Sequence, residues 1–239
     1  MDTVKIERKR VKMIAHRGVS GLECENTCAA FVAAGNRSYF GIETDTHVTA
    51  DGKFVIIHDE STERVSGVTA NVEELALDDL SHIRLYDKEV GITRCDLAIP
   101  RLEEYIRICH RYDKVAVLEL KNTMPVESCA EIIKIITALG HIEQTIFISF
   151  SKENCLQIRA LSPSAQVQFL KSSWDDALLD WLADNRLDLD IHYRAVTKEL
   201  VDQIHSKGLE INVWTVDSPE TGEALVNMGV DYITTNILE

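Results

Sequence analysis

The sequence lacks an uninterrupted apolar run that could cross a membrane. A membrane-spanning helix needs about 18 or more consecutive apolar residues, and no run in this chain of 239 residues approaches that length. The basic N-terminus is also not followed by the apolar core of a signal peptide, because Met13 to Ala15 leads straight into His16. These two absences predict a cytoplasmic protein that is not inserted in a membrane.

The chain contains six cysteines, but they are scattered along the sequence. None of them forms a C-x-x-C pair. Cys24 and Cys28 flank the start of the first predicted helix, and they have no histidine or cysteine partners at the spacing of a zinc site. We therefore expect reduced thiols without a metal.

Positive charge is scarce, because 25 Lys and Arg residues stand against 39 Asp and Glu residues, and the net charge is −14. Such an acidic protein is poorly suited to nucleic acid or to an anionic membrane surface. The composition, with 45% hydrophobic and 27% charged residues, is otherwise that of a globular protein with ample core. We predict a single domain, residues 1–239, because α/β barrels often reach this size.

Strand-like apolar runs alternate with helix-like segments along most of the chain. We expect eight strands, at residues 11–16, 39–48, 115–121, 145–150, 166–170, 187–191, 210–216 and 231–235. Eight strands with helices between most of them predict a (β/α)8 TIM barrel, an α/β fold. An open doubly wound sheet is the alternative, and 187–191 has the weakest strand pattern. Residues 59–100, which include a polar turn at 63–71, interrupt the repeat and predict a short insertion packed over the barrel mouth.

Two carboxylates lie on one face of the second predicted strand. Glu43 and Asp45 are two residues apart, and alternate residues of a strand point to the same side. Asp51-Gly52 predicts a hairpin directly afterwards, because the link is too short for a parallel crossover. With these as the two turn residues, Asp45 faces His58, and a bulge would shift this register while leaving His58 near the carboxylates. His47 shares the face but lies further out, and we assign it no catalytic role.

Further polar residues stand near the ends of the predicted strands. His16-Arg17 ends the first strand, and Glu119 and Lys121 end the third. The polar run Glu25-Asn26-Thr27 starts the helix that follows the first strand, with Asn26 as its predicted N-cap. Barrel enzymes place their sites at the C-terminal ends of the strands. We therefore expect these side chains to meet the two carboxylates and the histidine of the hairpin.

Three carboxylates at one mouth repel each other unless a cation lies between them. Glu43, Asp45 and Glu119 offer only oxygen atoms, and oxygen ligands suit Mg²⁺ or Ca²⁺ better than zinc. The alternative is a set of structural salt bridges to Arg17 and Lys121. The pattern favours one divalent metal ion, Mg²⁺ or Ca²⁺.

The order of these motifs resembles that of the glycerophosphodiester phosphodiesterase family. The matching segments run over almost the whole chain: His16-Arg17-Gly18, Glu25-Asn26-Thr27, Ile42-Glu43-x-Asp45, Thr49-x-Asp51-Gly52, His58-Asp59, Leu118-Glu119-Leu120-Lys121, Ser149-Phe150 and Trp214-Thr215-Val216. The resemblance implies metal-dependent hydrolysis of glycerophosphodiesters to sn-glycerol 3-phosphate and an alcohol. Two positions depart from the family pattern, Cys24 in place of proline and Asn236 in place of the commoner aspartate. We expect neither to touch the metal ligands or the histidines.

The resemblance also implies roles for the charged residues. His16 and His58 would move protons as general acid and base, because imidazole can donate or accept near neutral pH. Arg17 would bind the phosphate with its planar fork, and Lys121 would hold a phosphate oxygen as a point charge. Glu25 would orient Arg17 or a metal-bound water, or would only complete the helix start. The sequence leaves open which histidine is the base and whether a cyclic phosphate forms.

Two aromatic residues complete the predicted site. Phe150 and Trp214 would pack against the glycerol carbons or the alcohol head group, with ordinary core packing as the alternative. The expected partner is a small glycerophosphodiester, and a homo-oligomer is left open. Two other functions remain as alternatives: a lysophospholipid or cyclic phosphodiester hydrolase of the same fold, and a catalytically silent phosphodiester-binding protein.

Overall fold

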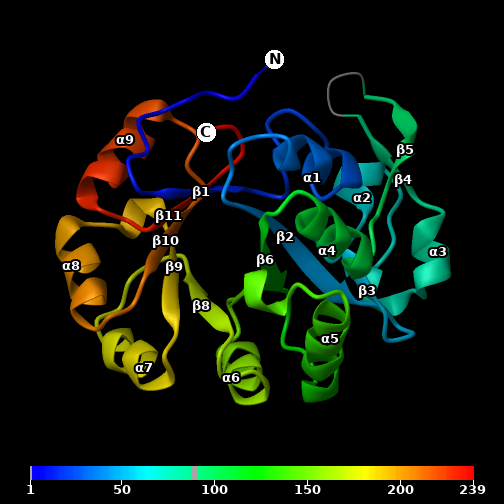
Figure 1. Ribbon diagram of the computed structural model, residues 1–239. Coiled ribbons are helices and arrows are strands. Elements are labelled where there is room, and N and C mark those ends of the chain that lie inside the picture. The colour runs from blue at the N-terminus through cyan, green and yellow to red at the C-terminus, as the bar shows by residue number, and fades with distance from the viewer. Residues whose placement is uncertain (1, 88–90) are drawn as a thin grey trace.

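The strands of the main sheet close into a barrel in the computed structural model, which describes residues 2–87 and 91–239 (Figure 1). Within these ranges the barrel has eight parallel strands, in the order β1 (Lys12–Ala15), β2 (Gly41–Val48), β6 (Val115–Leu120), β7 (Thr145–Ser149), β8 (Gln166–Lys171), β9 (Asp188–His192), β10 (Ile211–Trp214) and β11 (Tyr232–Thr235). The ring is closed because β1 pairs with both β2 and β11. The predicted TIM barrel is confirmed, including the strand with the weakest pattern, and the open sheet is excluded.

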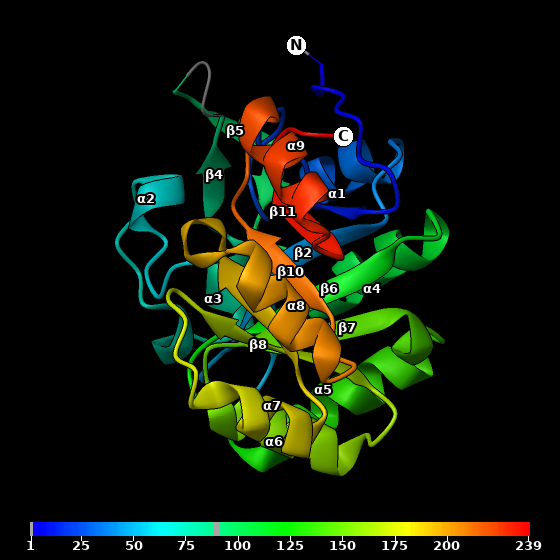
Figure 2. The same ribbon diagram turned by 90° about the vertical axis from the view of Figure 1, so that its left-hand side faces the viewer.

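Helices surround the barrel and follow the strands in turn, as the two ribbon views show (Figures 1 and 2). They are α1 (Cys28–Gly35), α4 (Leu102–Arg111), α5 (Val126–Ala138), α6 (Lys152–Leu161), α7 (Leu178–Asn185), α8 (Lys198–Ser206) and α9 (Pro219–Met228), with short 3₁₀ turns η2 (Ile142–Gln144) and η3 (Tyr193–Ala195). In α4 the buried residues Leu102, Tyr105, Ile106 and Cys109 form one apolar face. Among the residues that the structure describes, no helix combines the length and the apolar character needed to cross a membrane.

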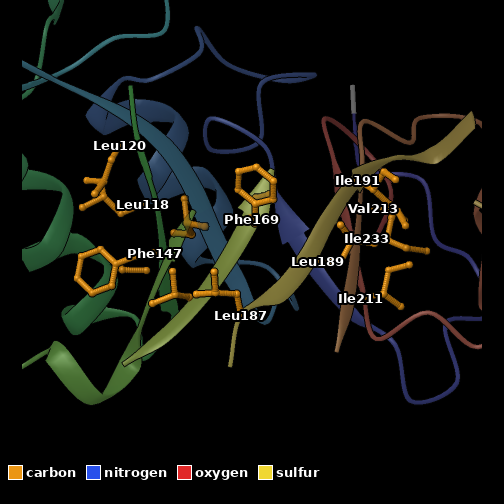
Figure 3. Packing of buried hydrophobic residues seen from close by; sticks show 14 of the residues in the cluster. Leu118, Leu120, Phe147, Phe169, Leu187, Leu189, Ile191, Ile211, Val213 and Ile233 are labelled. Atoms are coloured by element: carbon orange, nitrogen blue, oxygen red, sulfur yellow. The ribbon is translucent and has the colours of Figure 1, made fainter. Parts of the chain in front are cut away.

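Alternate residues of the barrel strands face two different apolar cores. Leu118 and Phe147 belong to the large cluster that includes residues of the surrounding helices (Figure 3). Val117, Ile146 and Ile148, at the alternating positions of the same strands, belong to a separate and smaller cluster. The period of two therefore assigns each strand one face toward the helices and one toward the barrel interior.

The pairing register of the hairpin after β2 differs from the predicted register by one residue. Strand β3 (Phe54–Ile56) pairs antiparallel with β2 in a register that leaves a three-residue loop. The loop ends at Gly52, which has a φ of 72° and supplies the left-handed residue that such loops need. The prediction that Asp45 faces His58 is wrong, because the backbone amide of Ile57 donates to the carbonyl of Asp45 at 3.1 Å.

The chain between β3 and α4 forms short elements beside the barrel (Figure 2). These elements are α2 (Glu63–Ser66), the 3₁₀ turn η1 (Val72–Glu74), α3 (Leu77–Ser81), β4 (Arg84–Tyr86) and β5 (Thr93–Ala98). Their buried residues, which include Val65, Leu80 and Leu97, pack with Val55 and Ile57 of the hairpin. The polar turn predicted at 63–71 is corrected in part, since its first four residues form α2.

A half-buried carboxyl group, that of Asp188, lies at the opposite end of the barrel from the predicted site, where the strands begin. Oδ1 of Asp188 accepts a hydrogen bond from the backbone amide of Glu210 at 2.8 Å, and Oδ2 lies 3.3 Å from Nε2 of Gln166. Burial is the main cause that raises the pKa of Asp188 to about 6, and the Glu210 carboxylate adds to it. Between about pH 4 and pH 6 the folded protein therefore keeps a proton on Asp188 that the unfolded chain has already released.

We expect this group to weaken the fold as the pH rises. The folded-state pKa lies above the unfolded value, so the contribution of Asp188 is present below about pH 4 and is lost as the pH rises through 6. Asp188→Asn should unfold like the native protein at pH 4 and be more stable by about 2 kcal/mol at pH 7. Urea denaturation at several pH values measures the difference, and a difference that does not change with pH would contradict the prediction.

Candidate active site

Three carboxylates of two neighbouring strands converge at the mouth of the barrel. Glu43 and Asp45 are on β2, Glu119 is on β6, and the strand register places Asp45 directly beside Glu119. All three are buried, and one oxygen from each lies within 4.8 Å of the others. The cluster predicted from the sequence is therefore present in the structure.

The pKa values of these three carboxyl groups reflect their crowding and burial. Burial raises the pKa of Glu43, and the Asp45 carboxylate raises it further. Burial and Asp45 together raise the pKa of Glu119 to about 7. Burial also opposes the ionisation of Asp45, but Arg17 and Lys121 more than offset it and lower its pKa to about 2. Fully ionised, the three groups would need an additional positive charge.

One carboxylate oxygen has no protein donor. Oδ1 of Asp45 is buried and has no hydrogen-bond partner among the described residues, and the ammonium nitrogen of Lys121 lies 3.5 Å away. The other oxygen, Oδ2, accepts a hydrogen bond from the side-chain amide of Asn26 at 2.8 Å. An unpartnered buried oxygen beside two other carboxylates fits a hard divalent cation, which takes only oxygen ligands. These residues could therefore hold the predicted metal.

Asn26 does not cap the first helix, as the sequence pattern had predicted. The N-cap of α1 is Thr27, whose hydroxyl oxygen accepts from the backbone amide of Ala30 at 3.2 Å. Asn26 instead lies behind the carboxylates, where its oxygen also accepts from the hydroxyl of Thr44 at 2.7 Å. This contact fixes the amide so that its nitrogen faces Asp45.

Arg17 and Lys121 are the cationic groups closest to the carboxylates. Nη1 of Arg17 donates to Glu25 at 2.9 Å, its Nε lies 3.4 Å from Asp45, and its backbone amide donates to Glu43 at 2.8 Å. Lys121 lies 2.9 Å from Glu119. The structure thus brings Glu25, predicted only as a supporting residue, into direct contact with Arg17.

The turn that carries Arg17 depends on a glycine at the next position. Gly18 has a φ of 75°, and a Cβ atom there would lie 2.6 Å from the Cβ of Ala30. No other residue fits both the left-handed backbone and the close approach of α1. The His-Arg-Gly segment therefore turns sharply at the end of β1, which directs both polar side chains to the site.

His16 contacts Asn236, one of the two residues that depart from the family pattern. Nδ1 of His16 lies 2.7 Å from Oδ1 of Asn236, whose amide nitrogen donates to Asp217 at 2.6 Å. Because a carboxylate only accepts, the amide oxygen faces His16, and Nδ1 of His16 carries the proton. Nε2 is then a free acceptor, 4.0 Å from Glu43. The expectation that Asn236 touches neither histidine is wrong.

His58 is paired with a carboxylate instead. Its Nδ1 donates to Oδ1 of Asp59 at 2.6 Å, so Nε2 is also the free nitrogen of this ring. His47 holds the segment from behind, since its buried ring lies 3.2 Å from the backbone carbonyl of His58 and 2.8 Å from Glu73. Burial lowers the pKa of both catalytic candidates, to about 4 for His16, and nearby Arg17 adds to the shift.

A cavity of about 190 Å³ is lined by most of the predicted site residues, but Asp45, Lys121 and Glu25 are not among its lining residues. It is lined by His16, Arg17, Glu43, His58, Glu119, Ile148, Phe150, Leu170, Asp190, Trp214 and Thr234. Its apolar wall includes Phe150 and Trp214, whose rings meet edge to face with centroids 5.8 Å apart. Phe150 is 47% exposed, so this ring is available for contact rather than packed in the core. One side of the cavity is thus charged and the other is apolar.

Asp190 lines this cavity and was not singled out from the sequence. It is 1% exposed, its Oδ1 has no hydrogen-bond partner among the described residues, and burial raises its pKa well above the usual value. The signal was weak, because the residue is a single aspartate in the strand with the poorest pattern. Its inward direction does follow from the alternation of β9, where Leu189 and Ile191 face the helices.

The sequence of this chain matches a family model over most of its length. The model is that of the glycerophosphoryl diester phosphodiesterase family, and it matches residues 16–239. The chain belongs to this family. The predicted family is therefore confirmed, and with it the prediction of an enzyme.

Relatives of known name agree with this assignment. The chain is 29% identical over 230 residues to a glycerophosphodiester phosphodiesterase of Caldanaerobacter subterraneus subsp. tengcongensis, a match that covers 94% of this chain and 93% of the relative. It is 27% identical over 248 residues to a glycerophosphodiester phosphodiesterase of Bacillus subtilis, with 95% and 84% covered. Among solved structures, an Oleispira antarctica phosphodiesterase in complex with the product sn-glycerol-3-phosphate has a TM-score of 0.85 at 24% identity, with 97% and 95% covered. That likeness supports the fold.

Proposed function

We propose that this protein hydrolyses glycerophosphodiesters to sn-glycerol 3-phosphate and an alcohol, with one divalent cation, Mg²⁺ or Ca²⁺. Family membership supports the reaction. The observation that carries the finer proposal is a cluster of three buried carboxylates, two of which, Glu43 and Glu119, line one cavity together with the two histidines. We also propose that residues 1–239 form a single catalytic domain, with 59–100 as an insertion at the barrel mouth. The cytoplasmic location and a homo-oligomer stay predictions.

The charged wall of the cavity would bind the phosphate. Glu43, Asp45 and Glu119 would hold the cation, which supplies charge stabilisation for the phosphoryl oxygens when bound. Arg17 would place its guanidinium against the phosphate, because Glu25 already fixes one of its nitrogen atoms. Lys121 would neutralise a further oxygen as charge develops in the transition state.

The two histidines would divide the proton transfers. The amide of Asn236 holds His16, and the lowered pKa of His16 favours its neutral ring. The free Nε2 of this ring is suited to accept a proton from the attacking group, which is either water or the glycerol 2-hydroxyl. Burial lowers the pKa of His58 as well, but the Asp45 and Asp59 carboxylates oppose this shift and favour the protonated ring, Asp59 by direct hydrogen bonding. We therefore assign His16 as the general base and His58 as the general acid that protonates the leaving alcohol.

The apolar wall would select the organic part of the substrate. Phe150 and Trp214 offer ring faces and edges to the glycerol carbons or to a small head group. A lysophospholipid would need a larger apolar surface for its acyl chain, and Phe150 is the exposed large hydrophobic residue of this cavity. We therefore favour a short head group over a lipid tail.

A panel assay tests the proposal. Release of sn-glycerol 3-phosphate would be measured from glycerophosphodiesters with choline, ethanolamine or glycerol head groups, and from a lysophospholipid and a cyclic phosphodiester. We expect turnover of the small substrates, a loss of at least ~10²-fold after EDTA treatment, and recovery with Mg²⁺ or Ca²⁺. Turnover that resists EDTA would reject the metal, and hydrolysis of the lysophospholipid alone would reject the substrate class.

A further inference from the structure

One arginine of α2 contacts the partners of two predicted site residues. Nε of Arg64 donates to Oδ2 of Asp59 at 2.5 Å, and Oδ1 of the same carboxylate accepts from His58. Nη1 and Nη2 of Arg64 donate to the two oxygens of Glu25 at 2.9 and 2.8 Å. Arg64 therefore uses all three guanidinium nitrogens on two carboxylates that each touch a site residue.

Glu25 lies between two guanidinium groups. Its carboxylate accepts from Arg64 on one side and from Nη1 of Arg17, at 2.9 Å, on the other. The Glu25 side chain is 7% exposed and that of Arg17 17%, so solvent screens this contact much less than it screens an ordinary surface pair. A bidentate fork on a buried carboxylate also fixes the direction of that carboxylate, which a single contact would not do.

Arg64 itself is not part of the cavity. It is absent from the residues that line it, whereas His58 and Arg17 are both present. Its only route to the reacting atoms among these contacts is through Asp59 and Glu25. Residue 64 also lies outside the barrel strands, on a four-residue helix between β3 and α4.

We propose that Arg64 is a positioning residue that aligns His58 through Asp59 and Arg17 through Glu25. This proposal rests on the proposed function, because it assigns both targets their roles there. One side chain thereby couples the group that donates a proton to the group that binds the phosphate. Lysine cannot replace it, because a single ammonium group lacks the three-nitrogen fork that reaches both carboxylates.

Kinetics of variants test the proposal, with a matched control in the same segment. Arg64→Ala and Arg64→Lys should both lower kcat/KM by about 10- to 50-fold, with kcat reduced through His58 and KM raised through Arg17. Arg94→Ala is the control, because Arg94 also bridges carboxylates of the segment, Asp87 and Asp96, and its contacts within residues 2–87 and 91–239 include no predicted site residue. It should stay within about twofold of the native kcat/KM.

Double variants separate positioning from general stabilisation. If Arg64 acts through Asp59, then Arg64→Ala made in an Asp59→Asn background should lower kcat by less than about threefold. Full additivity of the two losses would overturn the proposal, and so would native kinetics of Arg64→Ala. Thermal unfolding of each variant identifies any that fails to fold.

A measurement without substrate keeps this proposal separate from the proposed function. In protein labelled with ¹⁵N-histidine, the ring signals of His58 should shift in Arg64→Ala and stay unchanged in Arg94→Ala. Unchanged His58 signals in Arg64→Ala would overturn the positioning role, whether or not the protein is active. A native protein that hydrolyses none of the substrates would reject the proposed function, and the NMR experiment would still decide on Arg64.

Discussion

His16→Ala and His58→Ala are each expected to lower kcat by about 10²- to 10⁴-fold with the fold intact. Each ring presents a free Nε2, since its Nδ1 proton is donated to Asn236 or to Asp59. Replacing a ring by a methyl group removes the proton acceptor or donor from that point of the cavity. Steady-state rates of glycerol 3-phosphate release at saturating substrate measure the effect.

A second histidine–aspartate pair supplies the control. His205 donates to Asp231 at 2.8 Å and is 33% exposed, the same fraction as His58. This pair lies where β10 and β11 begin, at the opposite end of the barrel from the cavity. His205→Ala should therefore keep kcat within about twofold of the native value. A His58 variant that behaves like the His205 variant would remove His58 from the proton transfers.

The two histidines should also act as one unit. Once the acid is lost, the leaving alcohol departs unprotonated, and the base can no longer contribute its full effect. The double variant is therefore expected to be only slightly slower than the slower single variant, rather than slower by the product of the two factors. If the loss of kcat in the double variant equals the product of the two single losses, the two rings act in separate steps.

The barrel and most of its site were predictable because both depend on short periods in the sequence. Alternation along β2 places Glu43 and Asp45 on one side whatever the rest of the chain does. The eight strands followed from apolar runs separated by helical segments. Polar residues at strand ends then had one common place to meet, because the C-terminal ends of parallel strands lie together.

The contacts that refine the site were not predictable, because they join residues distant in sequence through side-chain geometry. Asn26 fits the pattern of an N-cap, but it turns inward to Asp45 because Thr27 caps the helix. Asn236 reaches His16 over 220 positions. Arg64 lies in a segment that reads as a polar turn, and only the fold shows that it reaches Glu25.

The hairpin error has a definite physical cause. Asp51-Gly52 suits both a two-residue turn and the end of a three-residue loop with a left-handed glycine. The hydroxyl of Thr49 favours the longer loop, because it accepts from the backbone amide of Lys53 at 2.9 Å and donates to the carboxylate of Asp51 at 2.6 Å. The register shifts by one residue, yet His58 still lines the cavity because it comes only two residues after the end of β3.

Glu119→Gln is expected to abolish the response to the divalent cation while stabilising the cation-free protein. In the absence of a cation, burial and the Asp45 charge raise the pKa of Glu119 to about 7, so ionisation of this group opposes folding near neutral pH. A neutral amide removes that penalty and can still accept from Lys121. It also removes one of the three anionic ligands, so we expect activity to fall by about 10³-fold and the cation affinity to fall at least tenfold.

Thermal unfolding with and without Mg²⁺ or Ca²⁺ measures both effects. The native protein should gain Tm on addition of the cation, because a ligand that binds only the folded state stabilises it. Glu119→Gln should start at a higher Tm and gain little. Asp190→Asn is the matched control, since it neutralises another buried carboxyl of the same cavity outside the cluster of three, and it should keep the cation-induced gain. An undiminished gain in Glu119→Gln would mean that Glu119 holds no cation and that Lys121 alone balances its charge.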